Sequence, residues 1–271
     1  MHEVVPADVR AEIVRRLELA EREHGVKILL AIESGSRAWG FWSPNSDFDV
    51  RFIYVRPRDW YLSVDLEDKR DVIEYPIVDD IDLNGWDLRK ALRLFLRSNP
   101  AFVEWIQSPI TYVESGPFRD AIRALLPVVF SPERGRHHYR SMAKANYRDF
   151  LRADLVPLKK YFYVLRPVLA RRWIDRFQSA APIEFERLLA MIEGEAEILG
   201  SIATLLEKKR AAPELGLAER VDVLNAFIES EIERADLEAA TAAGAAHEAI
   251  AEASIAVVNA LFRDLIAANP A

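Results

Sequence analysis

Apolar positions in the first part of the chain alternate between helical and extended spacing. Residues 6–24 carry apolar side chains three and four positions apart, which predicts an amphipathic helix that ends at a glycine. Residues 27–32 and 48–55 are short runs rich in β-branched and aromatic side chains, and both predict strands. Residues 71–83 predict a third strand, in which Pro76 marks an edge position or a break. This part of the sequence therefore predicts a small sheet with helices.

The pattern changes further along the chain, where helical spacing replaces extended runs. Asn84 and Gly85 predict a turn into a helix at 86–97. After about residue 131 we expect almost entirely helical structure, with helices at 134–153, 157–177, 182–209, 218–240 and 245–267. The expected fold class is α+β: a small mixed β-sheet domain over residues 1–125, followed by an all-helical domain over residues 126–271.

The composition excludes several classes of site. The 271 residues include no cysteine, which rules out disulfides, thiolate zinc sites and cysteine nucleophiles. The sequence contains no run of about eighteen uncharged apolar residues, so no membrane span is expected. Charges throughout the first thirty residues leave no signal-peptide core. We therefore expect a cytoplasmic protein.

The candidate chemistry centres on paired carboxylates in the segment SDFDVRFIY. Asp47 and Asp49 are two residues apart at the entry to a predicted strand, so both side chains should point to one face. Two carboxylates held together repel each other unless a cation neutralises them, and an all-oxygen site suits Mg²⁺ or Mn²⁺. Asp82, at the end of the next predicted strand, is the expected third ligand, in preference to Asp80. The alternative is turn chemistry, which leaves Asp49 unexplained.

Three carboxylates around two metal ions form a known arrangement for in-line displacement at phosphorus. The turn at Gly35 and Ser36 lies between two predicted strands, where a glycine lets the backbone approach a phosphate closely. Ser36 offers a hydroxyl donor, and Arg37 adds a fixed positive charge. These three residues are therefore the expected phosphate contacts.

Positive charge is concentrated in the middle of a chain whose net charge is −7. Residues 134–172 hold eleven Lys or Arg against two acids, whereas residues 213–271 hold eleven acids against three Arg. Cations recur at every fourth position of one predicted helix, which places them on one side: Arg136, Arg140, Lys144, Arg148 and Arg152. The next predicted helix carries the candidate nucleotide contacts Lys159, Lys160, Tyr163 and Arg166. Cations beside aromatic rings suit phosphates and a stacked base, and the alternative is a solvated helix face.

Several separated motifs, in order and spacing, resemble the RlaP-like nucleotidyltransferases of the DNA-polymerase-β-like superfamily, which are associated with RNA ligase and RNA repair. The resemblance covers roughly residues 28–235 and is carried by GSRAWGF, SDFDVRFIY, DIDLNGWDLRKAL, SNPAFVEWIQSPI and KKYFYVLRP. It implies a palm-like catalytic domain and a helical substrate-binding domain. It also implies Gly35 and Ser36 at the phosphate turn, Asp47 and Asp49 as paired metal ligands, and Asp82 as the third carboxylate.

The expected function is a metal-dependent transfer of a nucleoside monophosphate from an NTP to a hydroxyl acceptor, with release of pyrophosphate. The expected acceptor is an RNA end reached through the local basic helical patch, a protein or a small molecule. A short or terminal RNA contact fits the net charge of −7 better than a long footprint. Two alternatives stay open: a non-catalytic nucleotide- or RNA-binding module of the same fold, and a toxin–antitoxin nucleotidyltransferase that modifies a protein.

Overall fold

The computed structural model describes residues 4–211, 216–242 and 250–269, and the chain divides into two compact units. Unit 1 comprises Met1–Ala38, Asp47–Phe130 and Ile250–Ala271, and unit 2 comprises Trp39–Ser46 and Ser131–Ala249. The division differs from the expected one in two ways. It falls after Phe130 rather than after residue 125, and each unit takes a segment from the other's part of the sequence.

Unit 1 is built on a mixed five-stranded sheet in the order β3-β4-β2-β1-β5. The strands are β1 (Lys27–Glu33), β2 (Phe48–Val55), β3 (Val72–Glu74), β4 (Ile81–Asp87) and β5 (Thr111–Glu114). The central pair β2 and β4 is parallel, and the other pairs are antiparallel. The mixed sheet confirms the expected α+β class.

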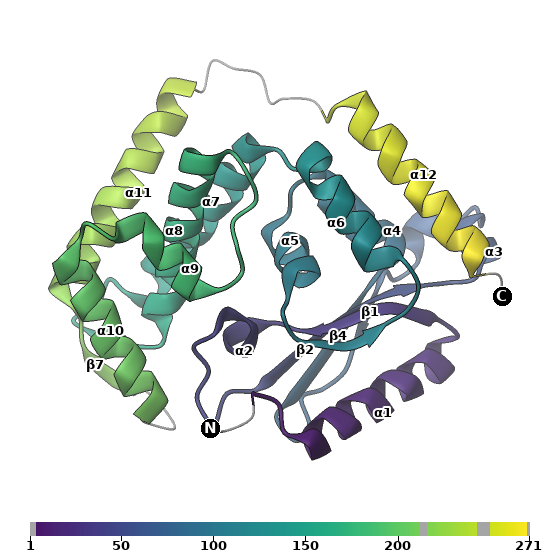
Figure 1. The fold of residues 1–271 in the computed structure, drawn as a ribbon, viewed down its shortest axis with the longest axis horizontal. Coiled ribbons are helices and arrows are strands. Elements are labelled where there is room, and N and C mark those ends of the chain that lie inside the picture. Colours follow the sequence, from purple (N-terminus) through teal and green to yellow (C-terminus); the bar gives the residue numbers. More distant parts are fainter. Residues whose placement is uncertain (1–3, 212–215, 243–249, 270–271) are drawn as a thin grey trace. The chain divides into compact units, whose positions relative to one another are not determined.

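Helices cover both faces of this sheet (Figure 1). One face packs on α1 (Ala7–His24), whose Ile13 and Leu17 contact the β1 and β2 side chains. The opposite face is covered by α4 (Leu88–Leu96), α5 (Pro100–Gln107), α6 (Phe118–Val129) and α12 (Glu252–Ala268). Short helical turns fill the connections: α2 (Gly35–Trp39), α3 (Arg58–Tyr61) and η1 (Leu66–Asp68). Both faces of β1 and of the second half of β2 are therefore buried, which fits the nearly continuous apolar runs in these segments.

Two local expectations for unit 1 were wrong. Asn84 and Gly85 do not form a turn, because β4 continues through both residues to Asp87. The glycine is required by packing, since a Cβ atom at Gly85 would lie 2.2 Å from the ring of Phe52 on β2. The strand expected at 71–83 is interrupted after β3, and a tight hairpin turn precedes β4.

Unit 2 is mainly helical. Its helices are α7 (Pro132–Phe150), α8 (Lys160–Phe177), α9 (Phe185–Leu189), η2 (Ala190–Ile192), α10 (Ala196–Ala211) and α11 (Asp222–Ala242). It also contains a small antiparallel pair of strands, β6 (Leu155–Pro157) and β7 (Leu217–Glu219), so the expectation of an all-helical second domain was not fully met. The start of the helix expected at 245–267 lies outside the described residues. Among the helices that the structure describes, none is both long enough and apolar enough to cross a bilayer.

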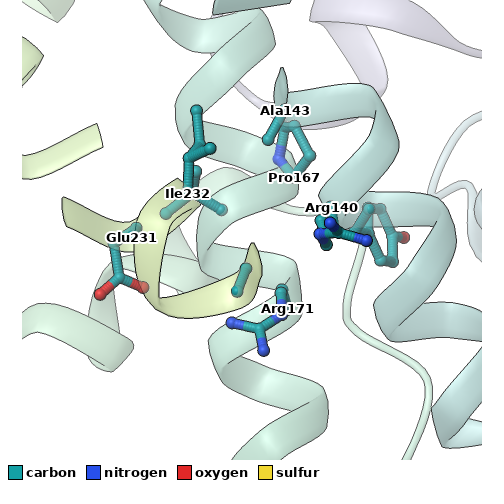
Figure 2. Close-up of a pocket in the computed structure, with 9 residues that line it drawn as sticks. Arg140, Ala143, Pro167, Arg171, Glu231 and Ile232 are labelled. Carbon is teal, nitrogen blue, oxygen red and sulfur yellow. The ribbon is translucent and has the colours of Figure 1, made fainter. Parts of the chain in front are cut away.

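The acidic helix α11 packs on the basic helices α7 and α8 within unit 2 (Figure 2). Arg140 and Lys144 of α7 both donate to Asp236, each at 2.7 Å. Arg172 of α8 makes a bidentate ion pair with Glu231: its Nε and Nη2 atoms donate to Oε2 and Oε1, each at 2.9 Å. The stripe of cations on α7 is therefore partly neutralised by the acidic part of the same chain.

The ion pairs of Glu231 predict a pH-dependent stability of unit 2. Burial by itself raises the pKa of Glu231, but hydrogen bonds from Arg172 and Arg234 outweigh it and lower the pKa to about 2, from 4.5. A carboxylate with a depressed pKa stabilises the fold above its unfolded-state pKa and loses that effect as the pH falls towards the folded-state value. We expect the wild-type protein to lose about 1–3 kcal/mol of unfolding free energy through this group between about pH 4.5 and pH 2.

The measurement is urea unfolding of the wild type and Glu231→Gln at several pH values between 7 and 3. The wild type should be the more stable protein at pH 7, and the difference should shrink as the pH falls. Glu233→Gln changes an exposed acid on the same helix and serves as the matched control. A difference between wild type and Glu231→Gln that stays constant across this range would contradict the assignment.

Candidate active site

The parallel pairing of β2 with β4 brings two of the predicted acids side by side. The register aligns Asp49 with Asp82, so the two residues form one rung of the sheet. Side chains at one rung of neighbouring strands point to the same face and lie close together. The side chains are 31% and 27% exposed, respectively, so both remain accessible from solvent. The structure thus places two carboxylates together at the beginning of the two parallel strands.

Arg51 links these two carboxylates. Its Nη2 atom donates to Oδ2 of Asp82 at 2.7 Å and to Oδ1 of Asp49 at 3.3 Å. Its Nη1 atom donates to the backbone carbonyls of Val50 and Asp82, at 3.0 and 2.9 Å. Arg51 lies two positions after Asp49 on β2, and therefore on the same face. A cation already occupies the space between the acids.

Asp47 and Asp80 lie one position before the starts of β2 and β4. The backbone N–H of Phe48 donates to the carbonyl of Asp80 at 2.8 Å. Both acids precede their strands and are exposed. Asp80 has a φ of 59° and belongs to the hairpin turn before β4. Within the described residues, no group of three or more acidic or histidine side chains is arranged to hold a metal ion. The predicted role of Asp47 as a metal ligand stays a prediction.

The electrostatics of Asp49 suit a site for a divalent cation. Burial raises the pKa of Asp49, and the charges of Asp82 and Asp47 raise it further, against the opposing effect of Arg51. The ionised form of Asp49 is therefore disfavoured, chiefly because the carboxylate is buried. A hard divalent cation bound through carboxylate oxygens would relieve this repulsion. The donor set of Asp49 and Asp82, with Asp47 beside them, therefore fits Mg²⁺ or Mn²⁺ in its chemistry.

Gly35 packs directly against the carboxylate of Asp49. It has a φ of +58°, and a Cβ atom there would lie 1.9 Å from Oδ2 of Asp49. The backbone N–H of Ser34 donates to the carbonyl of Asp49 at 2.8 Å, which fixes the turn against β2. Ser36 is half-buried in the short helix α2. The glycine is needed for close approach to Asp49, and the predicted phosphate contacts of Gly35 and Ser36 stay predictions.

The side chain of Arg37 contacts the backbone at Val4 and at Asp47. Its side chain is buried, and its Nη1 atom donates to the carbonyl of Val4 at 2.5 Å. Its Nε atom donates to the carbonyl of Asp47 at 3.3 Å, and its guanidinium lies 3.9 Å from the ring centre of Phe48. These contacts indicate that Arg37 holds the backbone around Asp47. The proposed contact of Arg37 with a nucleotide stays a prediction.

Glu33 supports the site and was not singled out from the sequence. It is fully buried at the end of β1, and its Oε1 atom accepts from the backbone N–H of Asp49 at 3.0 Å. The hydroxyl of Tyr112 donates to Oε2 at 2.6 Å. Burial raises the pKa of Glu33 to about 7. The sequence did offer one indication of this role: Glu33 is a single acid at the end of a mostly apolar strand, immediately before the glycine turn.

The predicted nucleotide contacts on α8 belong to unit 2, where they meet aromatic rings. Arg166 is buried with its guanidinium 4.0 Å from the ring centre of Trp39. Tyr163 is 38% exposed and packs edge-on against Trp39, with ring centres 5.5 Å apart. The structure thus brings Tyr163 and Arg166 together around Trp39, a residue of the segment that precedes Asp47.

The charge of Lys159 affects two other lysines of unit 2, Lys160 and Lys209. Lys159 is exposed, and Lys160 lies 4.7 Å from the ring centre of Tyr163. Burial lowers the pKa values of Lys160 and Lys209, and the charge of Lys159 lowers both further. Lys209, on α10, was missed by the sequence analysis because it lies about fifty residues from the other two. Mutual repulsion among these cations would be relieved by an anion.

The chain is similar to known proteins over most of its length. The model of the RlaP family, described as "RNA repair pathway DNA polymerase beta family", matches residues 9–264. The chain is 48% identical over 226 residues to "Uncharacterized protein YcgL" of Bacillus subtilis (strain 168), covering 83% of this chain and 86% of that protein. A nucleotidyltransferase-like protein from Exiguobacterium sibiricum 255-15 aligns with 12% identity and a TM-score of 0.34. That alignment covers 82% of this chain and 75% of the other.

Proposed function

Because the chain belongs to the RlaP family, the RNA repair pathway DNA polymerase β family, we propose that it transfers a nucleoside monophosphate from an NTP to a hydroxyl acceptor. The observation that carries this proposal is the rung formed by Asp49 and Asp82, with Gly35 packed against Asp49. Paired carboxylates can hold the divalent cations that assist in-line displacement at phosphorus, and a glycine turn beside them lets the backbone approach a phosphate.

Asp49 and Asp82 would hold divalent metal, Mg²⁺ or Mn²⁺, with Asp47 as the third ligand. Bound divalent cations would supply charge neutralisation at the triphosphate and at the attacking oxygen. Asp47 is exposed, so its side chain has the freedom to turn towards the pair. Glu33 and Arg37 hold the backbone amide of Asp49 and the carbonyl of Asp47, and thereby position both acids.

In the proposed reaction, the acceptor hydroxyl oxygen forms a bond to the α-phosphorus of the NTP. The bond from that phosphorus to the bridging oxygen of the β-phosphate breaks, and pyrophosphate leaves with the bonding electron pair. The hydroxyl proton passes to a carboxylate, for which Asp82 is the candidate. Asp82 is half-buried and accepts a hydrogen bond from Nη2 of Arg51.

The cations of unit 2 are the proposed contacts for the triphosphate or the acceptor. The charge of Lys159 acts against the charges of both Lys160 and Lys209, which favours an anionic ligand. Tyr163 and Arg166 add an aromatic face and a guanidinium beside Trp39, which suit a stacked base. The description of the family refers to an RNA repair pathway, and we therefore propose an RNA end as the acceptor. A terminal contact also fits the net charge of −7.

The test uses the full chain with each of the four NTPs, labelled either at the α- or at the γ-phosphate. With Mg²⁺ or Mn²⁺, α-label should appear on an RNA end and γ-label in pyrophosphate, and EDTA should prevent both. Label from the γ-position on RNA would indicate phosphoryl transfer instead, and α-label on protein would indicate a protein acceptor. Tight NTP binding without pyrophosphate release under any of these conditions would contradict the proposal.

Asp82→Asn and Asp80→Asn form a matched pair for this assay. Both remove one acid near the start of β4, but the structure places only Asp82 of the two in register with Asp49. We expect Asp82→Asn to lose at least about 10²-fold in the rate of pyrophosphate release. Asp80→Asn should stay within a few-fold of the wild type, because asparagine tolerates its left-handed backbone well.

A further inference from the structure

The guanidinium of Arg51 is held in place by oxygen atoms. Its two terminal nitrogens contact two backbone carbonyls and one oxygen from each of Asp49 and Asp82. The Arg51 side chain is 18% exposed, so most of it is packed within the site rather than extended into solvent. It is the cation that balances the carboxylate pair in this structure.

The Nη2 atom of Arg51 contacts one carboxylate oxygen of each acid, and a metal ion shared by these oxygens would compete with it. Nη2 lies 2.7 Å from Oδ2 of Asp82 and 3.3 Å from Oδ1 of Asp49. Mg²⁺ binds carboxylate oxygens at about 2.0–2.1 Å, so an ion shared by these two oxygens would lie between them. The nitrogen and the ion cannot occupy that space together, and their positive charges repel each other at such distances.

We propose that Arg51 is the resident counter-ion of the carboxylate pair, and that a divalent cation must displace its guanidinium to bridge Asp49 and Asp82. This inference rests on the proposed function, because it assumes that the two acids bind metal. On this proposal, Arg51 opposes metal binding. The alternative is that Arg51 supports metal binding by holding Asp49 and Asp82 in the geometry that a metal ion needs. The two roles predict opposite effects of removing the guanidinium.

The experiment is a titration of the metal-free protein with Mn²⁺, in which free Mn²⁺ is followed by electron paramagnetic resonance. Arg51→Met removes the charge and keeps a long apolar side chain. We expect its Kd for Mn²⁺ to be at least about tenfold lower than that of the wild type. Without metal, Arg51→Met should have a lower melting temperature than the wild type, because the acids then lose the cation that contacts both of them. Mn²⁺ should raise the melting temperature of the variant more than that of the wild type.

Two further variants keep the result interpretable. Arg51→Lys retains one charge but cannot contact four oxygens, so its Kd should lie between those of the wild type and Arg51→Met, and it carries the test if Arg51→Met does not fold. Arg70→Met removes an exposed cation that pairs with Glu74, and it measures the effect of net charge alone. Its Kd should equal that of the wild type.

An equal or higher Kd for both Arg51 variants would overturn the inference while leaving the proposed function intact, provided that Asp49→Asn abolishes Mn²⁺ binding. An equal decrease in Kd for Arg70→Met would also overturn it, because the effect would then be one of overall charge. If neither the wild type nor any Arg51 variant binds Mn²⁺, both the inference and the proposed metal site fail.

Discussion

Asp49→Asn is expected to lose at least about 10³-fold in kcat/KM for nucleotidyl transfer while the protein remains folded. Asparagine has the same shape as aspartate, but it cannot provide the negative charge that a divalent cation needs. The measurement is the rate of pyrophosphate release over a range of metal concentrations. Higher metal concentrations should not restore the activity, because the bridging ligand itself is missing.

The stability of Asp49→Asn separates a chemical defect from a folding defect. Burial and the neighbouring charges of Asp82 and Asp47 raise the pKa of Asp49, so folding disfavours its ionised form. A neutral side chain at this position should therefore leave the melting temperature at pH 7 unchanged or higher. Activity within tenfold of the wild type would contradict the assignment of Asp49, and so would a loss of activity accompanied by unfolding.

Gly35→Ala is expected to combine a loss of stability with a loss of activity. Alanine disfavours the left-handed φ of +58°, which costs about 1–2 kcal/mol. Its Cβ atom would lie 1.9 Å from Oδ2 of Asp49, and such overpacking costs about 1–3 kcal/mol more. The Asp49 carboxylate must move to accommodate the methyl group, and a displacement of about 1 Å reduces the rate by about 10²-fold.

Gly25→Ala is the matched control for this substitution. Gly25 ends α1 with the same φ of +58°, and a Cβ atom there meets nothing within 4 Å. It should show the backbone cost alone, with unchanged pyrophosphate release. Denaturant unfolding and the pyrophosphate assay on both variants give the comparison. If Gly35→Ala matched Gly25→Ala in both measurements, the contact between the turn and Asp49 would contribute neither to stability nor to activity.

The local patterns of the sequence predicted much of the fold. Helical spacing predicted the helix at 6–24, which the structure shows as α1, and the apolar runs at 27–32 and 48–55 are β1 and β2. The errors have physical causes. Asn84 and Gly85 have the composition of a turn, but the ring of Phe52 on the neighbouring strand requires a glycine within β4. Tertiary packing outweighed local preference at that position.

The acids of the candidate site could be identified from the sequence, but their alignment could not. Spacing alone places Asp47 and Asp49 on one face, whereas the rung of Asp49 and Asp82 depends on how two strands pair. Arg51 and Glu33 were missed for a related reason. Their roles arise from contacts across strands, with Asp82 in one case and with the backbone of Asp49 in the other.

Each of the two units is built from separate segments of the chain, and this limits how the protein can be divided into fragments. The path enters unit 2 for Trp39–Ser46, returns at Asp47, leaves again after Phe130 and comes back at Ile250. A fragment that stops near residue 125 would lack α12, whose Val258 and Leu265 are buried in the core of unit 1. A fragment that starts there would lack Trp39, the ring that Arg166 stacks on. Truncation is thus a poor route to isolated domains, and point substitutions in the intact chain are the better means of assigning roles.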